Sequence, residues 1–177
     1  MKLKITTDYA IRTVLYLAET GRVTTSIEIS EAMKIPHNYL INIIRDMRKD
    51  DLIATLPGAN GGCVLAKPAE EIRLYDVIKA MEKTIQINRC LEEDGYCSRG
   101  ASSYCQIHKI YAELQSEILD RLKRYTIADI VCASLSKTRE RQKNKDSDAP
   151  LGPAGKNCET ISEKASQNGE PFNNTKT

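Results

Sequence analysis

Hydrophobic positions in the first fifty residues recur every three or four residues, in three separate runs. This period places apolar side chains on one face of a helix, so each run predicts an amphipathic helix. The first covers residues 7–20 and ends at Gly21, and the second opens at Thr25 with the Thr-x-x-Glu pattern of a capping box. The third begins near Pro36, whose fixed φ suits a first turn. The residues expected to face inward in the second and third helices are Ile29, Ala32, Met33, Leu40, Ile43, Ile44 and Met47.

The hydrophobic period changes after residue 51. Residues 52–56 and 63–66 are short apolar runs separated by a glycine-rich turn at 57–62, a pattern that predicts two strands joined in a hairpin. Three short helices followed by a hairpin is the element order of a winged helix-turn-helix, in which the third helix enters the major groove of DNA. We therefore predict a mainly α fold with a small β-hairpin wing, and assign residues 1–68 to a DNA-binding domain.

A second group of helices is predicted over residues 69–135. One helix covers residues 74–81, and a long one starts near Tyr104 with a narrow apolar stripe that resembles a coiled-coil seam. Such a helix after a DNA-binding head predicts a homodimer, and a last short helix starts with a cap at Thr126. Residues 136–177 carry almost no aliphatic side chains and predict a disordered tail. The stripe of the long dimerisation helix consists of Ile107, Tyr111, Leu114, Ile118, Leu122 and Tyr125.

Three cysteines and a histidine gather between the two predicted helices of the second half. Cys90, Cys97, Cys105 and His108 lie in a segment rich in Gly, Ser, Asp and Glu, which is typical of a loop rather than of a core. The chain has no apolar run of roughly 20 residues and no signal-peptide core, so we expect a cytoplasmic protein with no membrane contact. Cysteines in that compartment favour metal, cluster or redox chemistry over structural disulfides. An iron–sulfur cluster and a Cys3His zinc site both fit this donor set.

The outward face of the third predicted helix supplies candidate DNA contacts. The net charge is only +2, so this prediction comes from the architecture and not from composition. Arginine and lysine can bond phosphate or guanine, asparagine can read adenine, and glycine amides of the wing can meet phosphate. The sequence offers no acid–base pair, nucleophile motif or phosphate-binding loop, so we do not expect an enzyme. The candidate DNA-binding residues are His37, Asn38, Tyr39, Ile41, Asn42, Arg45, Lys49, Gly58, Asn60, Gly61 and Gly62.

Five motifs in order make residues 1–135 resemble the IscR/NsrR-type regulators, which are dimeric winged-helix transcription factors that mostly bind iron–sulfur clusters. The chain departs from the family pattern at Pro57, where an arginine is common, and at Ile41, where IscR has a base-reading glutamate. The motifs are Asp8-Tyr9-Ala10, Ile35-Pro36 with Asn38-Tyr39-Leu40, Gly58 with Gly61-Gly62, the three-cysteine loop, and residues 125–131.

The resemblance implies that Cys90, Cys97 and Cys105 are cluster ligands. Cys105 and His108 match the Cys-x-x-His ending with which IscR binds a 2Fe–2S cluster, whereas Asp8 matches the aspartate with which NsrR completes a 4Fe–4S cluster from the partner subunit. The fourth ligand is therefore His108, or Asp8 of the partner subunit. Both cluster types remain open.

We interpret the chain as a homodimeric repressor that binds a double-stranded DNA operator and senses nitric oxide, redox state or iron–sulfur supply through its cluster. Two alternatives stay open at this point. One is a zinc-stabilised or thiol-switched DNA-binding regulator without a cluster, and the other is a cluster or redox carrier that does not bind DNA. The sequence identifies neither the signal nor the target genes.

Overall fold

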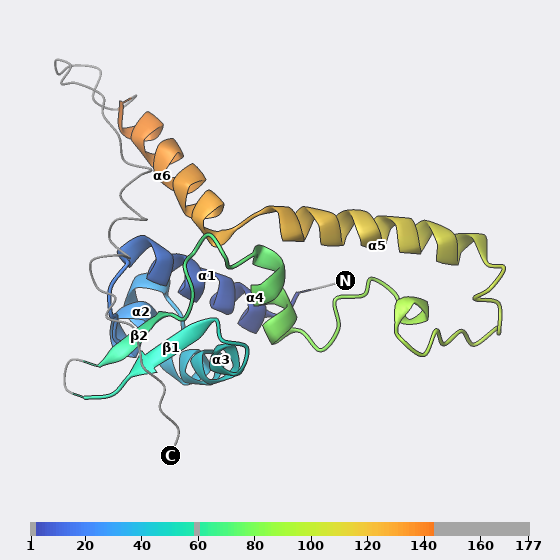
Figure 1. Ribbon diagram of the computed structural model, residues 1–177, viewed down its shortest axis with the longest axis horizontal. Coiled ribbons are helices and arrows are strands. Elements are labelled where there is room, and N and C mark those ends of the chain that lie inside the picture. Colours follow the sequence, from blue (N-terminus) through green and yellow to red (C-terminus); the bar gives the residue numbers. More distant parts are fainter. Residues whose placement is uncertain (1–2, 59–60, 144–177) are drawn as a thin grey trace.

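The computed structural model describes residues 3–58 and 61–143. A helical body carries a two-stranded hairpin, and one long helix projects from it (Figure 1). In chain order the elements are α1 (Ile5–Thr20), α2 (Ser26–Met33), α3 (His37–Lys49), β1 (Ile53–Leu56), β2 (Gly62–Leu65), α4 (Leu74–Met81), the 3₁₀ turn η1 (Arg89–Leu91), α5 (Gln106–Arg124) and α6 (Ile127–Lys143). The predicted class, mainly α with a hairpin wing, is confirmed.

Helix α1 lies at the centre of the body and packs against α2, α3, α4 and α6. It ends where Gly21 adopts the left-handed conformation, as the sequence predicted. Helix α2 begins with the Thr25 hydroxyl accepting a hydrogen bond from the Glu28 backbone, which is half of the predicted capping box. The inward face of α3 is buried at all four predicted positions, Leu40, Ile43, Ile44 and Met47.

The expected inward position of Ala32 is wrong, because this residue is exposed. Helix α2 is short, and Lys34 reverses the chain with a φ of 53° directly after it. That turn brings Ile35 into the core, where it is 2% exposed, and the Ser30 hydroxyl holds its carbonyl oxygen at 2.7 Å. Ile29 and Ile35 are therefore the core residues of this segment, and Ala32 stays at the surface.

The hairpin is antiparallel, with Ile53 opposite Leu65 and Leu56 opposite Gly62. A short third segment extends it, since the backbones of Thr24 and Cys63 exchange hydrogen bonds of 3.0 and 2.8 Å. A Cβ atom at Gly62 would lie 2.6 Å from the Thr24 carbonyl oxygen, closer than side chains can approach. Glycine at this position therefore lets the wing lie directly against the turn before α2.

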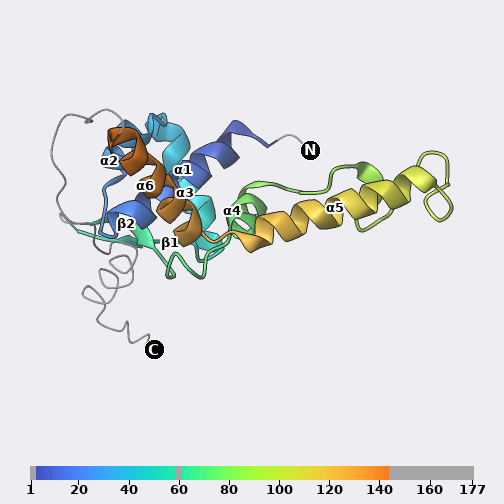
Figure 2. The same ribbon diagram turned by 90° about the horizontal axis from the view of Figure 1, so that it is seen from above.

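Helix α5 extends away from the body, and α6 turns back over α1 (Figures 1 and 2). The junction between them is fixed by backbone bonds: Leu74 donates to Tyr125 over 3.0 Å, and Ile127 donates to Ile72 over 2.8 Å. Ile127 and Val131 then bury against the body. Among the described residues, no helix is both long and apolar enough to cross a membrane.

Helix α6 starts at the predicted cap, where Thr126 and Asp129 exchange side-chain and backbone hydrogen bonds. It then continues to Lys143, beyond the predicted end of this last helix at residue 135. Lys, Arg, Glu and Gln have high helix propensity, and a helix already nucleated on a core can propagate through such residues without further burial. The rest of the predicted tail, 144–177, lies outside the described residues.

Candidate functional site

The outward face of α3 is exposed along its whole length. The seven α3 residues predicted to contact DNA are all solvent-accessible, while the opposite face of the same helix forms the core. The helix has a wide apolar stripe on one side and polar side chains on the other, so tertiary packing orients it unambiguously. The exposed candidates are His37, Asn38, Tyr39, Ile41, Asn42, Arg45 and Lys49.

A cleft of about 440 Å³ separates α3 from the wing and from the start of α2. Ile41, Arg45 and Arg48 line it from α3, Thr25 and Ser26 from the cap and first residue of α2, and Thr55, Gly61 and Gly62 from the wing. Arg48 was not among the sequence candidates. Its spacing of three from Arg45 and seven from Ile41 was the signal that would have placed it on this side of the helix.

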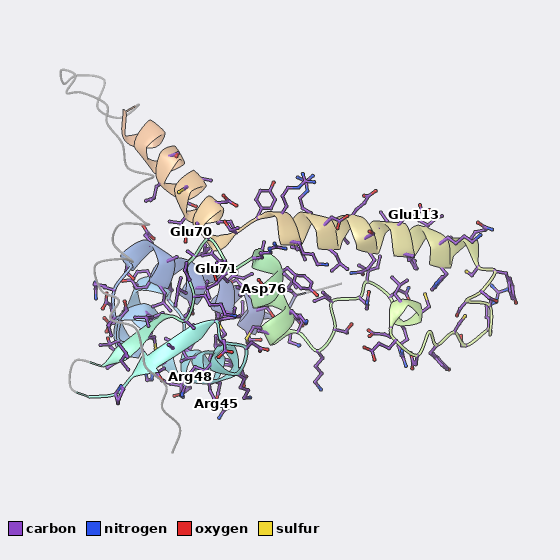
Figure 3. The ribbon with its side chains drawn as sticks, in the orientation of Figure 1. Arg45, Arg48, Glu70, Glu71, Asp76 and Glu113 are labelled. Carbon is purple, nitrogen blue, oxygen red and sulfur yellow. The ribbon has the colours of Figure 1, made fainter. Side chains whose placement is uncertain are left out.

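Two arginines give this face its positive charge. Figure 3 labels Arg45 and Arg48 side by side on α3, whereas Glu70, Glu71 and Asp76 lie apart from them around the start of α4. Within residues 3–58 and 61–143, neither Arg45 nor Arg48 forms an ion pair. Guanidinium groups that are exposed and unpaired can bond phosphate or the guanine edge.

Other side chains of the face make local contacts. The Asn42 amide donates to the Asn38 carbonyl at 3.1 Å, and the Lys49 ammonium lies 2.7 Å from the Asp46 carboxylate. The His37 ring lies 3.0 Å from the Ser26 hydroxyl and so links the starts of α3 and α2. These are exposed interactions, which a stronger polar partner can replace at little cost.

Tyr39 is held in place by α1. Its ring makes an edge-on contact with Tyr9 at a centroid distance of 6.3 Å, and the Arg12 guanidinium stacks over Tyr9 at 5.7 Å. Tyr39 nonetheless remains 52% exposed. The contact with Tyr9 holds the ring in place while the side chain stays accessible, which suits a hydroxyl contact to the DNA backbone.

The wing turn is built around its glycines. Gly58 has a φ of +107°, and a Cβ at Gly61 would lie 2.3 Å from the Leu56 carbonyl oxygen. The Gly61 amide donates to the Gly58 carbonyl at 3.0 Å and closes the turn. Asn60, the remaining wing candidate, lies outside the described residues. Cys63 faces the inner end of the cleft, and burial raises the pKa of its thiol.

The cysteine loop runs beside α5 at the end of the molecule away from the wing (Figures 1 and 2). Gln115, a buried residue of α5, ties the segment 85–87, just before the loop, to this helix. Its side-chain oxygen accepts from the Ile87 amide at 2.8 Å, and its nitrogen donates to the Ile85 carbonyl at 3.2 Å. Within the loop, Arg89 pairs with Asp94 and stacks over the Tyr96 ring.

Cys90, Cys97 and Cys105 are free, half-buried thiols on this loop. The backbone amides of Ala101 and Arg99 donate to the Cys97 sulfur and lower the pKa of its thiol, which favours the thiolate that metals bind. In the single chain, no group of three or more His, Cys, Asp or Glu side chains converges around a common point within the described residues.

The two candidates for a fourth ligand differ in their surroundings. His108 lies in the first turn of α5, and its Nδ1 is buried without a hydrogen-bond partner in the described part of the chain. Asp8 is half-exposed in the first turn of α1, where its carboxylate lies 2.5 Å from Arg12. A buried imidazole nitrogen without a hydrogen-bond partner is free to bind a metal, whereas a half-exposed carboxylate is accessible to another subunit.

The donor set matches the chemistry of an iron–sulfur cluster. Thiolates are the preferred ligands of such clusters, and imidazole or carboxylate can replace one of them. Cys97 already has a depressed thiol pKa, and both fourth-ligand candidates are oxygen or nitrogen donors.

Residues 3–133 match the Rrf2 family, described as "Iron-dependent Transcriptional regulator". The chain belongs to the Rrf2 family. It is thus a winged-helix, DNA-binding transcriptional regulator, and the predicted family relationship is confirmed. Members of this family are transcriptional regulators rather than enzymes, and they bind DNA and typically form dimers.

Solved structures similar to this Rrf2 chain share its fold at low sequence identity. CymR (YrzC), the global cysteine regulator of B. subtilis, superimposes with a TM-score of 0.62 at 19% identity, covering 75% of this chain and 98% of that one. T. potens IscR gives 0.60 at 18% identity, covering 86% and 94%. The oxidized form of S. aureus CymR gives 0.58 at 24% identity, covering 74% and 96%.

Proposed function

We propose that this Rrf2 regulator is a dimeric repressor whose binding to a DNA operator depends on an iron–sulfur cluster in the loop between α4 and α5. The observation that carries the DNA-binding part is the exposed face of α3, where Arg45 and Arg48 line a cleft against the wing without an ion-pair partner in the described chain. Asn38, Asn42, Lys49 and the wing glycines would complete the contacts, together with Asn60, which lies outside the described residues.

The sensing site comprises Cys90, Cys97 and Cys105 with His108 or Asp8 of the partner subunit. When bound, a cluster supplies a redox-active and nitric-oxide-reactive centre, and a non-thiolate ligand gives it a weaker corner. The chain's own part is to hold three thiols on one loop, to favour the thiolate of Cys97, and to tie the loop to α5 through Gln115. The unpartnered Nδ1 of His108 supports His108 as the fourth ligand, and the half-exposed carboxylate of Asp8 supports Asp8 of the partner subunit.

The proposal divides the chain into a DNA-binding unit (1–68), a sensing and dimerisation unit (69–135) and a tail. Since α5 joins the cysteine loop to the junction beside α4, a change at the loop would alter how two DNA-binding units are held in a dimer. Two such units about one helical turn apart favour a nearly palindromic operator.

The experiment that tests the sensor is anaerobic purification followed by visible absorption and by iron, sulfide and zinc analysis. A coloured protein with equal iron and sulfide supports the proposal, and the band shape separates 2Fe–2S from 4Fe–4S. Loss of colour in His108→Ala but not Asp8→Ala, or the reverse, identifies the fourth ligand. A colourless protein with one zinc per chain would contradict the cluster and indicate a structural zinc site instead.

A specific observation favours a second candidate, a regulator switched by its thiols without a cluster. The three loop thiols are separate and partly accessible in the single chain, and Cys97 has a lowered thiol pKa. This candidate predicts a colourless protein in which mild oxidation changes operator affinity and a thiol reductant restores it. Equal affinity of the cluster-loaded and cluster-free protein for the operator would contradict cluster-dependent binding. If the protein binds no DNA at all, the remaining candidate is a cluster or redox carrier.

A further inference from the structure

One large aliphatic side chain lies on the otherwise polar DNA-binding face. Ile41 is 47% exposed on α3 and is followed, one helical turn later, by Arg45. Three of the four apolar residues buried by the same helix are at most 1% exposed, so Ile41 does not belong to the core. Leaving half of an isoleucine in water has a free-energy cost that burial against a ligand would recover.

The position of Ile41 on the helix determines which ligand atoms it can meet. It lines the cleft with Ile44, Arg45 and Arg48 from α3, and with Thr55 from the wing. A DNA duplex whose major groove receives α3 would place base edges, and not only phosphates, against this row. The C5-methyl of thymine is the one bulky apolar group that base edges present in the major groove.

We infer that Ile41 is a specificity-determining residue that recognises the 5-methyl group of a thymine in each operator half-site. This inference rests on the proposed DNA-binding function and adds a base preference to it. Ile41 has no hydrogen-bonding atoms, so it can favour thymine only through contact with the methyl group. Arg45, one turn further along, would contact a guanine or a phosphate beside that thymine.

The test uses the full-length chain purified anaerobically, with and without cluster reconstitution, and a random duplex library. Selection with the wild type should yield a symmetric site with a thymine at one position of each half. Replacing that thymine by deoxyuridine removes only the methyl group, and should weaken wild-type binding about fourfold per half-site, the value of one buried methyl. Ile41→Ala should bind the thymine and deoxyuridine duplexes equally.

Two controls separate the methyl contact from general effects. Ile27→Ala removes an exposed isoleucine of α2 that is outside the set lining the cleft, and should keep the full deoxyuridine effect; Ile27 is 62% exposed. Deoxyuridine at a thymine outside the conserved positions should change nothing. Circular dichroism checks that Ile41→Ala is folded, as expected for a half-exposed side chain. If it is not, Ile41→Val serves as the second variant, and it should keep part of the methyl effect.

The outcomes distinguish this inference from the proposed function. Sequence-specific binding without a deoxyuridine effect, or with the same effect in Ile41→Ala, overturns the inference and leaves the regulator intact. Failure of the wild type to select any DNA, in either cluster state, overturns both. A deoxyuridine effect that is kept in Ile27→Ala, reduced in Ile41→Val and lost in Ile41→Ala establishes the contact.

Discussion

Arg45 and Arg48 lie three residues apart on α3 and both face the cleft against the wing. Each guanidinium carries five N–H donors in a rigid fork, and neither is engaged by a carboxylate in the described chain. A pair of free arginines at a groove attracts an anion more strongly than the net charge of +2 suggests, because no aspartate or glutamate is among the residues that line the cleft.

Replacing Arg48 by alanine should weaken DNA binding with little dependence on sequence. If Arg48 bonds a phosphate, the slope of log affinity against log salt concentration becomes shallower by about 1, and affinity falls by about 1 kcal/mol. Arg45→Ala should cost about 1–3 kcal/mol and relax selectivity at one position if it bonds a guanine. Fluorescence anisotropy at four salt concentrations measures both effects.

Lys79→Ala is a matched control for charge, since Lys79 lies on α4 over the Tyr75 ring. Its salt slope should equal that of the wild type. If both arginine variants also keep the wild-type slope and affinity, the cleft is not the DNA-binding surface.

Glu82 fastens the start of α1 to the end of α4. Its side chain is 8% exposed, accepts hydrogen bonds from Thr7 Oγ1 at 2.5 Å and from the Lys4 amide at 2.9 Å, and pairs with the Lys4 ammonium at 2.8 Å. Burial alone would raise the pKa of this carboxyl, but the hydrogen bonds from Lys4 and Thr7 outweigh it, so the pKa is lowered.

The lowered pKa of Glu82 predicts a stability that depends on pH. The carboxylate contributes fully above the unfolded value of about 4.3, and the contribution is lost as the pH falls through the lower folded-state pKa. Glu82→Gln should reduce the free energy of unfolding at pH 7 by about 1–3 kcal/mol and flatten its fall in acid. Urea unfolding at pH 7, 5 and 3 measures this, with exposed Glu113→Gln as the unchanged control. An acid response as steep in Glu82→Gln as in the wild type would contradict the assignment.

At the scale of elements, the wing depends on its contact with the turn before α2. Thr24 and Cys63 exchange two backbone hydrogen bonds, and the missing side chain of Gly62 allows the strands to approach. The same contact positions Thr55 opposite Arg45 and Arg48 across the cleft. The wing and α3 therefore line one continuous cleft, with the wing held against the turn before α2.

Gly62→Ala should separate the wing from this turn. Overpacking of a tight contact costs about 1–3 kcal/mol, so the midpoint of urea unfolding should fall, and operator affinity should fall with it. Gly100→Asn serves as the control, because a Cβ there meets nothing within 4 Å and asparagine tolerates its left-handed φ of 62°. Equal stability of the two variants would show that the wing can adjust its position.

At the scale of the whole molecule, α5 has an apolar row that the single chain leaves uncovered. Ile107, Ile110 and Leu114 are 51%, 49% and 44% exposed, at helical spacings of three and four. Figures 1 and 2 show this helix projecting from the body, with α4 and the segment that carries the cysteine loop beside it. A long helix with such a row is typical of a dimer interface in which two copies pair.

Leu114→Asp should convert the dimer to a monomer, because the carboxylate would be buried in an apolar seam. Sedimentation velocity over a range of concentrations measures the change, and binding to a two-half-site operator should weaken more than binding to a single half-site. Glu113→Ala, at the adjacent exposed position, should remain dimeric. Wild-type protein that sediments as a monomer would reject this role for α5.

Local rules explain how much could be predicted from the sequence. Helical period, the Thr25 cap, Pro36 and the glycine-rich turn act over a few residues, so the three helices and the wing were predictable, as were the buried face of α3 and the cap at Thr126. The exposed position of Ala32 was not predictable, since it depends on Ile35 entering the core after a left-handed turn. The length of α6 was not predicted, because a helix that starts by packing against the core can continue through residues of high helix propensity that are not part of that core.

Residue types at fixed spacings were enough to predict the family, the helix proposed to bind DNA and the candidate ligands of the loop, because each of these is written in a few neighbouring residues. Only the tertiary structure decided that Arg48, Ser26 and Thr55 share a cleft with Arg45, because these residues come from three elements that long-range packing brings together. It also decided that His108 has a vacant buried nitrogen while Asp8 is exposed beside Arg12. Long-range packing fixes such environments, and no spacing along the chain records them.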